Sequence, residues 1–127
     1  MSYTTEWEKN GVVWRYSDVV NGEELIKSNL EIYGDERFDI MKYQIVDLID
    51  VNTFQVTRDE MLKMAAYDKA AALSNPRVKV AIVATIPAIK TLTELYEAAN
   101  IESPWETRVF DSIADARAWV SPVHEEA

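Results

Sequence analysis

The sequence predicts an α/β protein with a mixed β-sheet, and three observations lead to this fold class. Two apolar-rich segments near the N-terminus flank Asn10-Gly11, a dipeptide typical of tight β-hairpin turns. Later strand-like segments each precede a helix-like segment, and this alternation indicates parallel strands joined by crossover helices. Residues 77–85, "RVKVAIVAT", form an apolar run rich in β-branched residues, as in a central strand covered on both faces. The expected element order is β-β-α-β-α-β-α-β-α.

The expected hairpin leads directly into the first helix. Alternate side chains of its second strand would point to opposite faces of the sheet: Val12, Trp14 and Tyr16 to one face, and Val13, Arg15 and Ser17 to the other. Asn21 is suited to cap the following helix, and Glu24 lies three positions later, as in a capping box. Gly34 suits the left-handed position after the last turn. The apolar stripe expected on this helix consists of Leu25, Ile26, Leu30 and Tyr33.

The middle of the chain combines a strand with a long helix. The segment "KYQIVDLIDV", residues 42–51, has the alternation of a strand, and a short polar loop is expected after it. The segment "TRDEMLKMAAYDKAAALSN", residues 57–75, is rich in helix-forming residues and ends before Pro76. Thr57 and Glu60 fit the capping-box pattern at its start. The expected buried face of this helix consists of Met61, Met64, Ala65, Ala72 and Leu73.

The C-terminal part continues the alternation of strand and helix. After the central strand, Pro87 suits the first turn of a helix that ends near Asn100. The segment "WETRVF", residues 105–110, predicts a last strand, and residues 111–120 predict a last helix capped by Asp111 or Ser112. The apolar side of the penultimate helix would consist of Ile89, Leu92, Leu95 and Ala99.

Chain length predicts a single domain over residues 1–127, because 127 residues are enough to bury a substantial core. The core is expected to cover residues 3–120. The tail over residues 121–127 is expected to be flexible.

Composition argues against several classes of function. The formal net charge of −9 does not suit non-specific binding to nucleic acid or an anionic membrane, which needs a basic face. The chain has no cysteine, and its single histidine, His124, lies in the expected tail. Thiol, serine–histidine and histidine–metal sites are therefore not expected, nor is any cofactor. The polar, acidic N-terminal segment and the lack of an apolar run of about 20 residues predict a cytoplasmic protein without an integral membrane segment.

Three segments carry a resemblance to a known group of proteins. They are "VDLIDVNTFQVTRDE" at residues 46–60, "VKVAIVA" at 78–84 with the helix after it, and the ending "RVFDSIADARAWV" at 108–120. With the element order, they make the chain resemble the SpoIIAA-like group, which includes STAS (anti-sigma-factor-antagonist) domains and small stand-alone bacterial proteins. The resemblance covers residues 3–120. It implies a non-enzymatic regulatory module that binds a protein partner, which the sequence does not identify.

The resemblance draws attention to Thr57. In STAS antagonists the equivalent loop carries a serine that a partner kinase phosphorylates, typically within "D-S-S-G". Here Thr57 is the nearest match, and the aspartate, the paired serines and the glycine are absent. Thr57 is thus interpreted first as a helix cap and second as a phosphoacceptor. The interaction loop that the resemblance implies consists of Asp50, Thr57, Arg58 and Glu60.

Two further hypotheses concern acidic and apolar side chains. Asp47, Asp50, Asp59 and Glu60 could cluster, but their spacing matches no metal-binding loop, and solvated surface acids are expected. The resemblance extends to Sec14-type lipid-binding domains, which implies the alternative function, a carrier or sensor of a small apolar or lipid-like ligand. The pocket for that ligand would consist of Met61, Met64, Leu92 and Tyr96. The four tryptophans are expected mainly in the core, and an exposed aromatic face would suit a homodimer.

Overall fold

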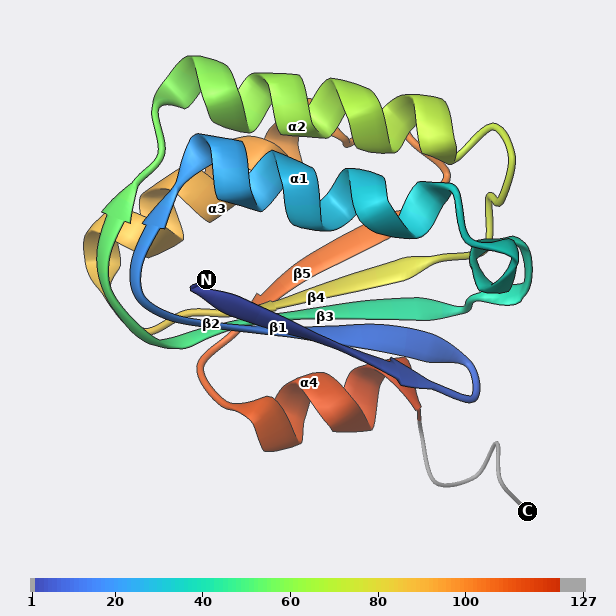
Figure 1. The fold of residues 1–127 in the computed structure, drawn as a ribbon, viewed down its shortest axis with the longest axis horizontal. Helices are drawn as coiled ribbons and strands as arrows, with labels where there is room; N and C mark the ends of the chain where they lie inside the picture. The colour runs from blue at the N-terminus through green and yellow to red at the C-terminus, as the bar shows by residue number, and fades with distance from the viewer. Residues whose placement is uncertain (1, 122–127) are drawn as a thin grey trace.

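The computed structural model describes residues 2–121, and Figure 1 shows how their elements are arranged. The predicted order is found with one addition, the short 3₁₀ helix η1. In chain order the elements are β1 (Tyr3–Glu8), β2 (Gly11–Asn21), α1 (Gly22–Tyr33), η1 (Glu36–Ile40), β3 (Tyr43–Gln55), α2 (Arg58–Ala71), β4 (Lys79–Val83), α3 (Pro87–Ala99), β5 (Glu106–Phe110) and α4 (Ile113–Val120). The expected flexible tail lies outside the described residues, apart from Ser121.

The five strands form one sheet in the order β1-β2-β3-β4-β5. β1 pairs with β2 in antiparallel fashion, and each later pair is parallel. Helices α1, α2 and α3 cover one face of the sheet, and α4 covers the other (Figure 1). All parallel strands therefore end at the same edge, where α1, α2 and α3 begin.

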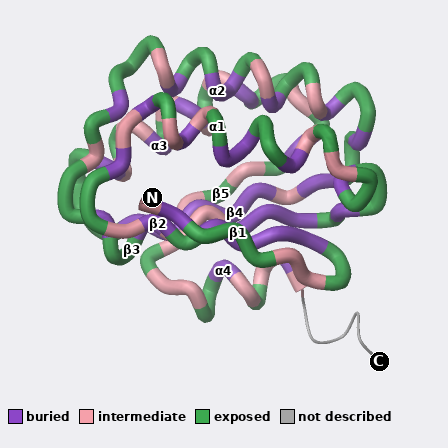
Figure 2. The backbone as a smooth tube through the Cα atoms, viewed as in Figure 1, coloured by how far each residue is buried: buried purple, intermediate pink, exposed green. Residues whose placement is uncertain are grey.

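Two apolar clusters lie on the two faces of the sheet. The larger cluster, under α1, α2 and α3, includes Trp14, Leu48 and Ile82. The smaller one, under α4, includes Val13 and Ala81. This division confirms the alternation predicted for β2, and Figure 2 shows the buried strands between the two helical layers. Among the described residues no tryptophan is exposed.

The polar loop expected after residue 51 is wrong, because β3 continues to Gln55. Its last residues pair with the end of β2, Thr53 with Val19 and Gln55 with Asn21. Polar side chains are tolerated there because the backbone is held by the ladder to β2. The true connection to α2 is only Val56 and Thr57.

Three predictions about the helices are wrong, two on buried faces and one on a C-terminal cap. Leu30 is 43% exposed and Leu73 is 86% exposed, so neither belongs to the buried faces. The buried side of α1 instead includes the polar Ser28 and Asn29, which a search for apolar periodicity passes over. Leu73 follows the end of α2 and lies in a turn that faces solvent. Gly34 has φ −88°, within the ordinary helical region, so the left-handed cap is also wrong.

Gly11 is required by close packing and not by a turn. Gly11 is the first residue of β2 and pairs with Glu8. The two-residue turn between the strands consists of Lys9 and Asn10, so it lies one position earlier than predicted. A Cβ atom at Gly11 would lie 2.5 Å from the ring and from the carbonyl oxygen of Tyr43, its partner in β3. The hydrogen of glycine thus permits β2 and β3 to pair closely at this point.

Replacing Gly11 should therefore destabilise the protein. We expect Gly11→Ala to lower the free energy of unfolding by about 1–3 kcal/mol, because backbone atoms of β3 must move. Gly34→Ala is the matched control. A Cβ atom there has no neighbour within 4 Å, and the backbone is already helical, so we expect no change or a gain of about 0.4–1 kcal/mol. Urea unfolding of both variants measures the difference, and equal effects would contradict the packing argument.

Candidate functional site

The first turn of α2 contains Thr57 in a complete capping box. The Thr57 hydroxyl accepts a hydrogen bond from the Glu60 backbone N–H at 3.1 Å, and the Glu60 carboxylate accepts one from the Thr57 N–H at 2.9 Å. Glu60 also lies against Gly22, where a Cβ atom would collide with its carboxylate. Thr57 thus has the structural role predicted for it, at the point where the starts of α1 and α2 meet.

The residues expected in the interaction loop do not all gather in one place. Thr57 and Arg58 are exposed on the first turn of α2, and Glu60 is half-buried beside them. Asp50 is also exposed, but it pairs with Ser17 and lies five residues before the end of β3. Since β3 is longer than expected, the strand separates Asp50 from Thr57.

The solvent-facing side of α2 carries an exposed apolar stripe. It consists of Leu62, Ala66 and Ala70 on the helix and Leu73 in the turn after it, and all four are exposed. Leu62 is 37% exposed. We call these four residues the α2 stripe. It is bordered by the exposed Arg58, Lys63 and Lys69, with Asp59 as the single acid among them.

A groove of about 600 Å³ runs between α1 and α2, next to the α2 stripe. Ile26 and the exposed Leu30 supply its apolar side chains. Its charged residues are Glu23, Lys27, Glu31, Glu60 and Lys63. The apolar part of the groove thus belongs to α1, and α2 contributes only the charged Glu60 and Lys63.

A small cavity lies between the sheet and the three helices. Met61, Met64 and Tyr96 line it, together with polar side chains such as Asn29 and Gln44. Leu92, the fourth residue expected in a ligand pocket, is not among the lining residues. The cavity volume is about 30 Å³, enough for one or two water molecules, whereas ligand pockets typically measure about 300–1,000 Å³.

Asp68 is buried at this cavity and was not predicted from the sequence. The hydroxyl groups of Tyr33, at the end of α1, and Tyr96, on α3, each donate a hydrogen bond to one of its carboxylate oxygens. Burial raises the pKa of Asp68 to about 6, although both hydrogen bonds favour the charged form. Asp68 lies seven positions after Met61, which is the spacing of residues on one face of a helix. This spacing was the sequence signal that could have predicted the burial of Asp68 on α2.

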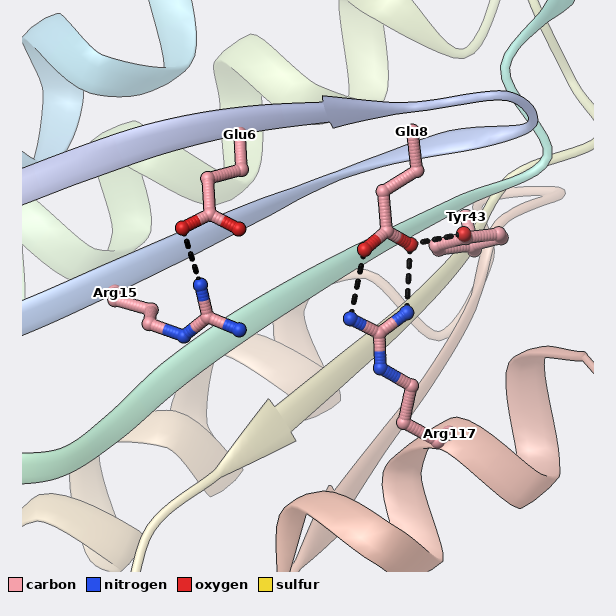
Figure 3. A network of polar contacts seen from close by, with 5 residues as sticks. All are labelled: Glu6, Glu8, Arg15, Tyr43 and Arg117. Atoms are coloured by element: carbon pink, nitrogen blue, oxygen red, sulfur yellow. Dashed lines mark hydrogen bonds and ion pairs between the residues drawn. The ribbon is translucent and has the colours of Figure 1, made fainter.

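A second polar network lies on the opposite face of the sheet (Figure 3). The guanidinium of Arg117, on α4, donates to both carboxylate oxygens of Glu8 at 2.6 and 2.7 Å. The Tyr43 hydroxyl donates to the same carboxylate, and the bond from Arg117 is the largest cause of the lowered pKa of Glu8. Glu6 and Arg15 form a separate ion pair at 2.5 Å between β1 and β2. The network attaches α4 to the hairpin.

The described residues contain neither a candidate metal site nor a helix that could span a membrane. No group of three or more histidine, cysteine, aspartate or glutamate side chains in residues 2–121 is arranged to hold a metal ion. Asp47, Asp50, Asp59 and Glu60 are thus not assembled into such a group. No helix in this part of the chain is long and apolar enough to cross a membrane. His124 lies outside the described residues.

Comparison with known proteins identifies the class of fold. No protein-family model matches the chain, and no curated protein sequence is similar to it. Among solved structures, the chain is similar to the anti-sigma factor antagonist SpoIIAA in its unphosphorylated form, with a TM-score of 0.60 and 9% identity over 89% of this chain and 91% of that one. It is also similar to an uncharacterized DUF3478-family protein with a SpoIIAA-like fold from Shewanella loihica PV-4. That TM-score is 0.53, at 16% identity over 93% and 91% of the two chains. The chain therefore has the SpoIIAA-like fold, as the sequence predicted.

The capping box at Thr57 can be tested by a pair of substitutions. Thr57→Ala removes the oxygen that accepts from the Glu60 N–H, so we expect the free energy of unfolding to fall by about 1 kcal/mol. Thr57→Ser retains the oxygen and should change it very little. Chemical denaturation of both variants measures the effect, and an equal loss in the serine variant would argue against capping.

The raised pKa of Asp68 predicts a specific pH dependence of stability. The folded chain binds the Asp68 proton more tightly than the unfolded chain, whose carboxyl titrates near 3.8. The stabilisation that the folded chain gains from protonated Asp68 is therefore fully present below about pH 4. It is lost as pH rises to about 6. Relative to Asp68→Asn, the wild-type free energy of unfolding should fall by roughly 2 kcal/mol between about pH 4 and 7.

The matched control for this titration is Asp39→Asn, which removes an exposed carboxyl on η1. It shows whether loss of an exposed carboxyl alone changes the profile in the way that Asp68→Asn does. Parallel profiles for wild type and Asp68→Asn would contradict the assignment of the titration to Asp68.

Proposed function

We propose that this chain is a non-enzymatic regulatory domain that binds a protein partner through the α2 stripe and the first turn of α2. The observation that carries this proposal is the exposure of Leu62, Ala66 and Ala70 along one side of α2 and of Leu73 in the turn after it. The opposite side of the same helix is fully used in the core, where Met61, Met64, Ala65 and Asp68 are buried. Apolar side chains that line up on the surface and do not pack into the core are typical of an interface.

Charge defines the kind of partner. The whole chain has a net charge of −9, yet the outer side of α2 carries Arg58, Lys63 and Lys69 against Asp59. A partner with apolar side chains flanked by acidic ones complements this surface, and the acidic remainder of the protein would repel the same partner elsewhere. The role of SpoIIAA as an anti-sigma factor antagonist supports a regulatory use of this fold.

The carrier hypothesis receives less support from the geometry. A lipid-like ligand needs a volume several times that of the cavity at Asp68, which is about 30 Å³. Phosphorylation of Thr57 stays a prediction. A phosphate would be favoured by the N-terminus of α2 and opposed by Asp59 and Glu60.

Site-specific crosslinking tests the proposed interface. A photo-crosslinking amino acid replaces Ala66 on α2 or, as control, the exposed Ala118 on α4, on the other side of the sheet. In the cells that make this protein, position 66 should crosslink to one defined partner and position 118 should not. The double substitution Arg58→Glu and Lys69→Glu should abolish the adduct while leaving thermal unfolding unchanged. Adducts that are the same at both positions, or that survive the charge reversal, would refute this interface.

A further inference from the structure

The open edge of β5 borders a second groove, whose lining residues include none of the α2 stripe. β5 is the last strand of the sheet and pairs only with β4. The groove has a volume of about 510 Å³ and is lined by the C-terminal half of α3, the connection after it and the start of β5. An edge strand presents unpaired backbone N–H and C=O groups to whatever lies beside it.

The sheet register shows that the groove follows this edge. Thr107 pairs with Val80, whose side chain belongs to the cluster under α1, α2 and α3. Arg108 pairs with Ala81, which belongs to the cluster under α4. Both Thr107 and Arg108 line the groove, although their side chains leave opposite faces of the strand. Because side chains from both faces of this edge strand line the groove, the groove lies along the unpaired side of β5.

Unpartnered polar atoms are concentrated in this groove. Four buried side-chain polar atoms among the described residues have no hydrogen-bond partner, and three of them belong to Asn100 and Thr107. Asn100 is only 4% exposed, and neither its amide nitrogen nor its amide oxygen is paired. Unpaired buried groups cost free energy, so their concentration at one place indicates a bound group that would pair with them.

The charge around the groove is predominantly acidic. Glu94 and Glu97 lie on α3, and Glu106 lies on β5, against the single Arg108. Burial, and next the neighbouring Glu94 carboxylate, raise the pKa of Glu97. A cationic side chain placed here would offset the repulsion between the two carboxylates.

We propose that this groove binds an extended, basic segment of a protein partner, which adds as a further strand beside β5. The backbone of such a segment offers the N–H and C=O groups that match the two unpaired ends of the Asn100 amide. Lysine or arginine at alternate positions would face Glu94 and Glu97. A second copy of this chain fits poorly, because it would bring a second acidic β5 edge and another net charge of −9 to the groove. The inference does not rest on the interface proposed for α2.

Peptide titration followed by nuclear magnetic resonance tests the groove directly. The probe is a capped peptide of about seven alternating lysine and valine residues, long enough to cover the five residues of β5. The control peptide has glutamate in place of lysine. The lysine peptide should shift the backbone amides of residues 106–110 and the side-chain NH₂ signal of Asn100, and the glutamate peptide should shift neither. No shift, equal shifts with both peptides, or shifts confined to the α1–α2 groove would overturn the proposal.

Substitutions distinguish this site from general attraction of a basic peptide to an acidic protein. Asn100→Leu removes the unpaired amide, so we expect a higher melting temperature together with peptide binding weakened by about tenfold. If that variant does not fold, Glu94→Gln with Glu97→Gln provides the same test at the groove surface. Glu31→Gln, in the α1–α2 groove, is the matched control and should leave binding unchanged. Equal weakening by the control, or a concentration-dependent dimer that shifts residues 106–110 without peptide, would overturn the proposal.

Discussion

The parallel pairing of β2 with β3 is the constraint on which the rest of the molecule depends. The two strands remain paired from Gly11 and Tyr43 to Asn21 and Gln55, with register shifts near Ser17 and Asp18, the latter at φ 58°. Because both strands end together, α1 and α2 begin side by side, and Glu60 of α2 lies against Gly22 of α1. The capping box, the α1–α2 groove and the orientation of the α2 stripe all follow from that shared end.

Asp68 connects the three helices on that face of the sheet. Its carboxyl group belongs to α2 and receives one hydroxyl each from Tyr33, at the end of α1, and from Tyr96 on α3. A buried carboxyl group is expensive without such partners, so each hydroxyl restricts where its helix can lie. This arrangement directs one side of α2 inward and leaves the α2 stripe in solvent.

The two proposed binding surfaces differ in charge and in backbone geometry. The outer side of α2 is locally basic and offers side chains on a regular helix, whereas the groove at β5 is acidic and offers an open strand edge. Opposite charges prevent the two surfaces from competing for the same partner.

The sequence by itself determined the order of strands and helices, the cap at Thr57, the interior, doubly covered position of β4 and the SpoIIAA-like fold. These features depend on local pattern, that is, on apolar periodicity, capping residues and β-branched runs. Only the tertiary structure decided the rest. Residues 52–55 extend β3 because β2 lies beside them, and Asp68 is buried because two distant tyrosines reach it. Leu62 on α2 and Leu73 in the turn after it are exposed because no element within residues 2–121 covers them. Long-range pairing and burial depend on neighbours that are far away in the sequence, and local pattern does not record them.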